Sequence, residues 1–235
     1  MARTFSITLL RVLLASAAFA MALSAAFVFE AARAAAAAFR EVDAALQGET
    51  PEMRVAALLQ AAEGVETSWA KPERWHAGAS EAVSWAYAAL APGDQSGVFT
   101  ARSITSAQRT LSRAPVQAPA WTRLAVFGER GQPNTVCAPQ ACLERSWRAV
   151  PLAPLATACA RLQLGHELGL IGSSDDPRVA LMAQVPMGRE TLSRCASFLS
   201  EAEMFRLMLR QEAAYAERER QARETGRSPF TRPYN

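Results

Sequence analysis

The sequence predicts an all-α protein in which an N-terminal transmembrane helix precedes a short body of paired helices. Half of the 235 residues are hydrophobic but only 8% are aromatic. Alanine dominates, with arginine, leucine and glutamate next, and this mix favours helix over strand. A long uncharged stretch lies near the N-terminus, and prolines recur at the ends of helix-like runs. No segment carries the alternation or turn residues of a β-hairpin.

The N-terminal stretch predicts a membrane anchor. Residues 12–29, VLLASAAFAMALSAAFVF, contain no charged residue. Eighteen residues of helix span about 27 Å, close to the bilayer core of about 30 Å. We therefore interpret residues 1–30 as a transmembrane anchor or an uncleaved signal. The alternatives are a buried core helix and a signal peptide cleaved near Ala20 or Ser24, which would release a soluble periplasmic helical binding protein.

The flanking arginines leave the orientation of this anchor almost balanced. Arg3 and Arg11 precede the stretch, and Arg33 and Arg40 follow it. Because an N-terminal apolar segment of this kind also directs export, we place the body outside the cytoplasm. The prediction is a single-pass protein of the bacterial inner membrane with a periplasmic body.

Composition divides the remainder of the chain into four parts. Residues 31–48 are alanine-rich and predict a helical stalk. A helical-repeat-like body is expected over 49–171 and C-terminal helices over 172–226. Residues 227–235 predict a disordered tail.

Helix start and stop signals define the first elements of the body. Thr50 is a suitable N-cap and Pro51 suits the first helical position, so a helix begins there. A second helix is expected over 72–90 and begins at a proline. A third helix over 99–114 ends at the next proline.

Helix start and stop signals also mark the elements of the second half of the chain. Asp176 is a predicted N-cap, and Ser200 with Glu203 forms a capping box that starts the last helix. The remaining helices are expected to begin at Trp121, to cover 142–150 and 154–171, and to follow Pro177 as two short helices broken near Pro186.

Two turns share one pattern and indicate an internal repeat. One lies in TLSRAPVQAPAWTRLAVF, residues 110–127, and the other in RSWRAVPLAPLATACARLQL, residues 145–164. Each has Arg-Ala, a proline, a short turn with a second proline, and then Arg-Leu on the next helix. Pro115 and Pro151 are about 36 residues apart, near the 34-residue period of helix-turn-helix repeats.

The first turn resembles the tetratricopeptide repeat family. In that family a proline ends one unit, and the next opens six residues later with tryptophan, leucine and a small residue. Pro115, Trp121, Leu124 and Ala125 match this pattern. The resemblance implies stacked helical pairs with a concave surface for protein partners.

Other positions depart from the tetratricopeptide pattern. Gly128 stands where an aromatic residue is usual, Pro139 replaces a small residue, and Thr157 replaces the tryptophan of the second turn. A generic alanine-rich bundle is therefore the alternative fold. The sequence pattern of the body is also similar to that of membrane-anchored helical proteins that accompany bacterial polysaccharide and O-antigen assembly.

The four cysteines give one candidate disulfide. Cys137 and Cys142 enclose a short proline-containing loop that can close in an oxidising compartment. Free thiols and metal binding are the alternatives, although no zinc-ligand spacing is present. Cys159 and Cys195 fall on apolar helix faces and are expected to be buried free thiols. A second bridge between them is the alternative.

No motif in the sequence identifies a reaction. His166-Glu167 is half of a metalloprotease motif, but Leu170 stands where the second histidine belongs. An enzyme that uses His76 or His166 is the alternative function. We assign no catalytic residue, cofactor or metal. The net charge of +3 is spread along the chain, so nucleic-acid binding is not expected.

The largest apolar side chains are either packing wedges or parts of a binding surface. The candidates for interaction are Trp75, Trp85, Trp121 and Trp147, together with Phe205 and Met208 of the last helix. The predicted function is that of a non-catalytic, membrane-anchored scaffold or accessory protein. It binds partner proteins in the bacterial envelope, with surface polysaccharide assembly as the candidate pathway.

Overall fold

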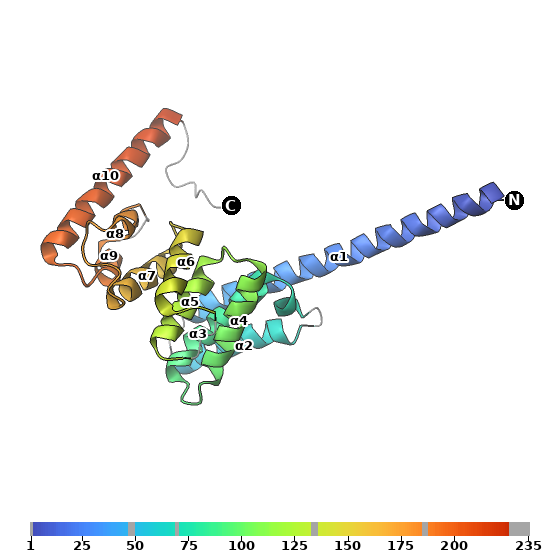
Figure 1. The fold of residues 1–235 in the computed structure, drawn as a ribbon, viewed down its shortest axis with the longest axis horizontal. Helices are drawn as coiled ribbons and strands as arrows, with labels where there is room; N and C mark the ends of the chain where they lie inside the picture. Colours follow the sequence, from blue (N-terminus) through green and yellow to red (C-terminus); the bar gives the residue numbers. More distant parts are fainter. Residues whose placement is uncertain (1, 47–49, 69–70, 133–135, 185–187, 226–235) are drawn as a thin grey trace. The chain divides into compact units, whose positions relative to one another are not determined.

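The computed structural model describes residues 2–46, 50–68, 71–132, 136–184 and 188–225, and every regular element in these ranges is a helix (Figure 1). The predicted all-α class is confirmed. The chain divides into two compact units, residues 1–115 and residues 116–235. We call them unit 1 and unit 2 and describe each by itself. The expected tail, 227–235, lies outside the described residues.

Helix α1 (Ala2–Leu46) has two different halves. Residues 13–29, here called the apolar half, are exposed throughout, and Figure 1 shows this half extending beyond the other helices of unit 1. By length and composition α1 is suited to cross a membrane. The following residues, 31–46, are the packed half. One face of the packed half is buried, and its buried residues are Ala31, Ala35, Ala38, Val42 and Ala45.

The sequence predicts a helical stalk over 31–48, and the packed half, its described part, is helical but packs into unit 1. Its buried residues recur every three or four positions, which places them on one helix face. Four of the five are alanines, so neighbouring helices can approach the backbone closely. Helices α2 (Pro51–Glu66) and α3 (Ala77–Leu90) pack against this face. The membrane-spanning candidate therefore continues without a break into the core of unit 1.

The rest of unit 1 follows the predicted boundaries with one correction. The Thr50 side chain caps α2 by accepting from the Met53 amide, as predicted. The helix expected over 72–90 is instead broken into the short turn η1 (Pro72–Arg74) and α3. The break has a local cause, because the His76 ring caps α3 and accepts from the Ala79 amide at 3.2 Å. The turn η2 (Ala91–Gly93) and helix α4 (Val98–Arg113) complete the unit.

Small side chains let α3 pack tightly at the centre of unit 1. Its residues Ala79, Ala82 and Ala86 are at most 1% exposed. Hydroxyl groups join α3 to α4, since Ser84 Oγ donates to the Ser103 carbonyl at 2.9 Å and Ser103 Oγ donates back at 2.8 Å. Buried serines with backbone partners carry no uncompensated polar group and allow close helix approach.

Unit 2 has helices of 6 to 13 residues, followed by a last helix of 25 residues. Its elements are α5 (Ala118–Glu129), α6 (Pro139–Ala149), α7 (Leu155–Glu167), α8 (Pro177–Met182), α9 (Arg189–Cys195) and α10 (Glu201–Thr225). The predicted caps are confirmed: Asp176 accepts from the Arg178 amide. Ser200 and Glu203 exchange bonds between side chains and amides.

A buried arginine joins three helices of unit 2. The guanidinium of Arg161, on α7, donates to the carbonyls of Ser146 and Val150 at 2.8 and 2.7 Å. These carbonyls end α6, where the helix dipole favours a positive charge. Arg161 Nε also donates to Ser146 Oγ, which donates in turn to the Ala118 carbonyl at the start of α5. Burial lowers the pKa of Arg161 to about 10.

The boundary between the two compact units lies at Pro115, inside the range 49–171 that the sequence predicts as one body. The turn with Pro115 lies at the boundary between the units, whereas the turn with Pro151 lies inside unit 2. Leu124 and Leu162, which occupy matching positions after the two turns, are both buried. A tetratricopeptide-like repeat remains a prediction.

Candidate membrane and partner-binding surfaces

The apolar half of α1 presents bulky hydrophobic side chains on all sides. Leu14, Phe19, Met21 and Phe29 are each more than 60% exposed. Water disfavours this much apolar surface on one helix, and a bilayer accepts it because the backbone bonds are satisfied within the helix. The apolar half therefore has the physical properties of a lipid-facing segment.

A charged pair and a tryptophan mark the end of the apolar half. Glu30 and Arg33 form an ion pair at 2.8 Å in the helical turn that directly follows it. Trp75, between η1 and α3, lies edge-on to Phe27 with the ring centroids 6.4 Å apart, and it is 37% exposed. Trp75, one of the predicted interaction residues, is thus at the junction between the apolar half and the helical body of unit 1.

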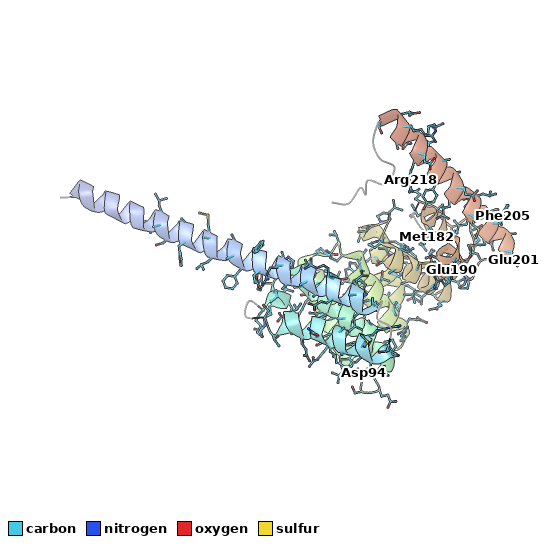
Figure 2. The ribbon with its side chains drawn as sticks, turned by 180° about the vertical axis from the view of Figure 1, so that it is seen from behind. Asp94, Met182, Glu190, Glu201, Phe205 and Arg218 are labelled. Atoms are coloured by element: carbon cyan, nitrogen blue, oxygen red, sulfur yellow. A yellow bond between two sulfur atoms is a disulfide. The ribbon has the colours of Figure 1, made fainter. Side chains whose placement is uncertain are left out.

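Helix α10 presents a second exposed apolar surface. Phe205 and Leu209 are 62% and 48% exposed, and four residues separate them on one face. Exposed alanines Ala202, Ala213 and Ala216 continue this face of the helix. We call these five exposed residues the outer stripe. Figure 2 shows Phe205 on the side of α10 that faces away from Met182 of α8. The other helices of unit 2 therefore leave the outer stripe exposed, so that a partner can contact it.

The inner face of α10 packs against unit 2. Leu207 is buried, and the predicted interaction residue Met208 is half-buried against the same apolar cluster. Met208 thus contributes to packing, whereas Phe205 is available for contact. The sequence pattern did not single out Leu209, although its spacing from Phe205 was the signal that could have found it.

Polar bonds hold α10 to the segment before α8. Arg210 donates to the Ser174 carbonyl and to the Asp175 carboxylate, both at 2.9 Å. The Glu203 carboxylate accepts from the amides of Ser200 and Ser174. The bonds from Ser200 are the main reason that the pKa of Glu203 is lowered, with the Ser174 amide adding to them. These contacts fix the N-terminal half of α10, which carries the outer stripe.

The three other candidate tryptophans take part in packing. Trp85 packs on the core of unit 1 with its ring 6.0 Å from that of Phe39. Trp121 is buried in unit 2, and Arg145 lies over its ring at 5.1 Å. The guanidinium of Arg178 covers the Trp147 ring at 4.4 Å. These positions fit packing wedges better than the lining of an open groove.

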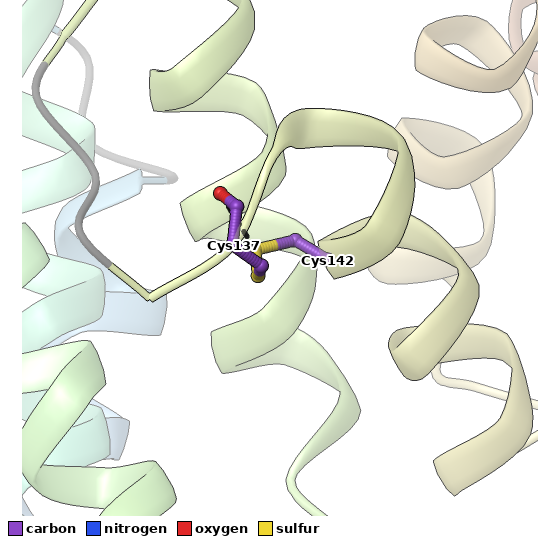
Figure 3. The surroundings of a disulfide bond; sticks show 2 residues. All are labelled: Cys137 and Cys142. Atoms are coloured by element: carbon purple, nitrogen blue, oxygen red, sulfur yellow. Dashed lines mark hydrogen bonds between the residues drawn. A yellow bond between two sulfur atoms is a disulfide. The ribbon is translucent and has the colours of Figure 1, made fainter.

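Disulfide bonds join all four cysteines in unit 2. The predicted pair, Cys137 and Cys142, closes the turn before α6 with its Cα atoms 5.6 Å apart (Figure 3). Cys159 and Cys195, expected as free thiols, form a second bridge between α7 and α9 with Cα atoms 4.7 Å apart. The expectation was wrong because the apolar faces of these two helices meet, which helix periodicity alone does not reveal.

Both histidines have structural contacts. His76 caps α3 through its Nδ1 atom. The His166 ring stacks on Phe198 with centroids 4.4 Å apart, and its Nδ1 lies 3.3 Å from the Ile171 carbonyl oxygen. Within the described residues, no group of three or more His, Cys, Asp or Glu side chains is arranged to hold a metal ion.

Comparison with known proteins gives no relative. No family model matches the chain, and no curated protein or solved structure is significantly similar to it.

Proposed function

We propose that the chain is a non-catalytic, membrane-anchored scaffold or accessory protein that binds partner proteins in the bacterial cell envelope. The apolar half of α1 anchors it in the inner membrane, and units 1 and 2 lie in the periplasm. The observation that carries the proposal is the division of α1. One helix is wholly exposed and apolar over 13–29 and contributes a buried face to the core of unit 1 from Ala31 onward.

The continuity of α1 makes the anchor part of the folded body. A flexible linker would let the body move freely over the membrane, whereas a helix buried on one face fixes unit 1 to its anchor. This rigid attachment suits a protein that positions others at the membrane. The two disulfides favour the periplasmic side, because such bonds persist in oxidising compartments.

The outer stripe of α10 is the proposed partner-binding surface. Phe205 and Leu209 are exposed apolar side chains four residues apart, the spacing of the anchors with which an amphipathic helix docks in a partner's groove. Surface polysaccharide assembly remains the candidate pathway, and its support is the resemblance in sequence alone.

Affinity capture tests this proposal. A C-terminally tagged full-length chain is solubilised in mild detergent from its native membrane, captured, and analysed by mass spectrometry against the Phe205→Ser/Leu209→Ser variant. The control variant is Met53→Ser/Val55→Ser, which changes two side chains of unit 1 with similar exposure, 62% and 46%. We expect a stoichiometric envelope protein with the wild type and the control but not with the α10 variant.

Three outcomes contradict the proposal. A chain that is captured alone has no stable partner, and a partner retained equally by all three forms binds elsewhere than the outer stripe. A soluble captured chain with a shortened N-terminus indicates the cleaved form. That form keeps the core of unit 1, because both candidate cleavage sites precede Ala31.

A further inference from the structure

The contact between Trp75 and Phe27 fixes the depth of one end of unit 1 in a membrane. Phe27 lies two residues before the end of the apolar half, or about 3 Å along the helix axis. If the apolar half spans the bilayer, as the proposed function requires, Trp75 lies at the level of the lipid headgroups. Tryptophan is enriched at that level because its ring is apolar and its N–H is polar.

Three other segments of unit 1 lie at the same end. Helix α3 starts two residues after Trp75, and η1 contacts α1, α3 and α4. The last turn of α4 reaches the first residue of α3, since Thr110 Oγ1 donates to the Ala77 carbonyl at 3.4 Å. The opposite end of unit 1 carries Asp94, which Figure 2 shows far from the apolar half. We call the end formed by η1, the start of α3 and the end of α4 the junction end.

Exposed arginines give the junction end a positive charge. Arg74 of η1 has a side chain 72% exposed, and Arg109 and Arg113 are exposed on the last turns of α4. Lys71 is also exposed, although its ammonium donates to the Glu66 carbonyl at 2.8 Å.

The neighbouring acids offset only part of this charge. Glu73 is 6% exposed and lies 3.7 Å from Arg74 Nε, and Glu30 is paired with Arg33. Glu66 forms an ion pair with Arg102 at 3.6 Å, and Glu63 is an exposed acid on α2 near this end. Among the described residues, neither Arg109 nor Arg113 forms an ion pair with a carboxylate.

We infer that the junction end binds anionic phospholipid headgroups, with Trp75 seated in the interfacial region and Arg74, Arg109 and Arg113 contacting lipid phosphates. Arginine matches phosphate geometry and remains charged at any physiological pH. A lipid surface is favoured over an acidic protein because the arginines adjoin the segment that would lie in the membrane. The contact sets the tilt of unit 1 on the bilayer, in addition to the anchoring by α1.

Selective fluorescence quenching tests this lipid contact. The full chain is reconstituted in two sets of nanodiscs with the same content of phosphatidylglycerol, about one-fifth, in phosphatidylcholine. One set carries bromine on the phosphatidylglycerol and the other carries an equal amount on the phosphatidylcholine. The signal of Trp75 is the difference between the wild type and Trp75→Phe in each set.

We expect brominated phosphatidylglycerol to quench Trp75 at least about twofold more than brominated phosphatidylcholine, because each interfacial arginine enriches anionic lipid about fivefold. The Arg74→Gln/Arg113→Gln variant should lose this preference. The matched control Arg40→Gln/Arg54→Gln removes two exposed charges of unit 1 away from the junction end, and it should keep the preference.

Three results overturn the inference and separate it from the proposed function. Equal quenching by the two lipids in the wild type shows that the junction end has no anionic preference. Absence of quenching in a reconstituted chain shows that Trp75 lies away from the bilayer while the anchor stands. An acidic protein that is retained by the wild type and lost from the arginine variant assigns these arginines to a protein partner. A chain that fails to enter nanodiscs contradicts the membrane anchor itself.

Discussion

The helical cores of units 1 and 2 are stabilised in different ways. Unit 1 uses helices of 14 to 16 residues beside the packed half of α1, joined by alanine-rich faces, and it contains no cysteine. In unit 2, helices α5 to α7 have 11 to 13 residues, and α8 and α9 have 6 and 7. Helix α10 has 25 residues, but its buried residues are Leu207 and Gln211 alone. Both disulfides and the buried Arg161 lie in unit 2.

This difference shows how helix length substitutes for covalent and polar restraints. A short helix buries little apolar surface and is marginal by itself. Unit 2 gains order from cross-links and from a charge that caps a helix end, whereas unit 1 gains it from the continuation of a long helix. The two units should therefore respond differently to reduction, to overpacking and to pH.

The largest expected effect is the loss of the Cys159–Cys195 bridge. Its ends are separated by 36 residues, so removing it should lower the free energy of unfolding of unit 2 by about 4 kcal/mol on the chain-entropy estimate. Cys159→Ser is compared with the wild type by hydrogen exchange mass spectrometry of the full chain in detergent. Faster exchange is expected in α7 and α9, with unchanged exchange in α2 to α4.

The bridge between Cys137 and Cys142 provides the control. It closes a loop with a separation of only 5 residues, so Cys137→Ser should cost about 2 kcal/mol. Equal losses for the two variants, or faster exchange in unit 1, would contradict the division of restraints between the units.

Removal of the buried guanidinium should have the next largest effect. Arg161→Met keeps much of the side-chain volume but leaves the carbonyls of Ser146 and Val150 without their donor. A loss of about 3 kcal/mol is expected, because hydrogen bonds from a charged donor contribute about 1.5–3 kcal/mol each. Exchange in α6 and α7 measures it. Arg161→Lys should recover part of the loss, and no loss with Met would mean that Arg161 does not cap α6.

Overpacking should affect unit 1 and spare unit 2. Ala82→Leu adds a branched side chain at a site that is 1% exposed, and a cost of about 2 kcal/mol is expected. Exposed Ala101 of α4 is the matched control, and Ala101→Leu should change stability by less than about 0.5 kcal/mol. Thermal unfolding, monitored by hydrogen exchange of the amides of α3, distinguishes the two variants. Tolerance of leucine at position 82 would show that the core of unit 1 is loose.

The smallest expected effect concerns Tyr87 at high pH. Burial, together with the hydrogen bond to Glu66, raises the pKa of Tyr87 to about 12. The folded state therefore favours the neutral phenol, and its contribution to stability is complete below pH 10 and lost as the pH rises through 12. Stability of unit 1 should fall over this interval in the wild type. Tyr87→Phe should lack that component and should cost about 1 kcal/mol at neutral pH.

Local signals in the sequence predict helix ends well. Thr50, Asp176 and the Ser200–Glu203 capping box all occupy their predicted roles, because each acts on amides within three residues. The break before α3 escaped prediction because a histidine supplies its cap, and histidine is not among the preferred N-cap residues.

Long-range packing explains the other differences. The alanines from Ala31 to Ala45 have the period of a buried face, but alanines also fill the positions between them, so the sequence does not distinguish the inner face. The bridge between Cys159 and Cys195 depends on how α7 and α9 meet. No local pattern contains that information. The exposure of Phe205 and the burial of Trp121 depend likewise on tertiary contacts.

Intact mass measured after alkaline carbonate extraction tests the membrane anchor most directly. Membranes from cells that produce the full chain are washed with carbonate, and the chain in the pellet and in the supernatant is weighed by mass spectrometry. We expect an uncleaved chain of 25.3 kDa that stays in the pellet. A soluble chain that begins after Ala20 or Ser24 would contradict it and would identify the apolar half of α1 as a signal peptide.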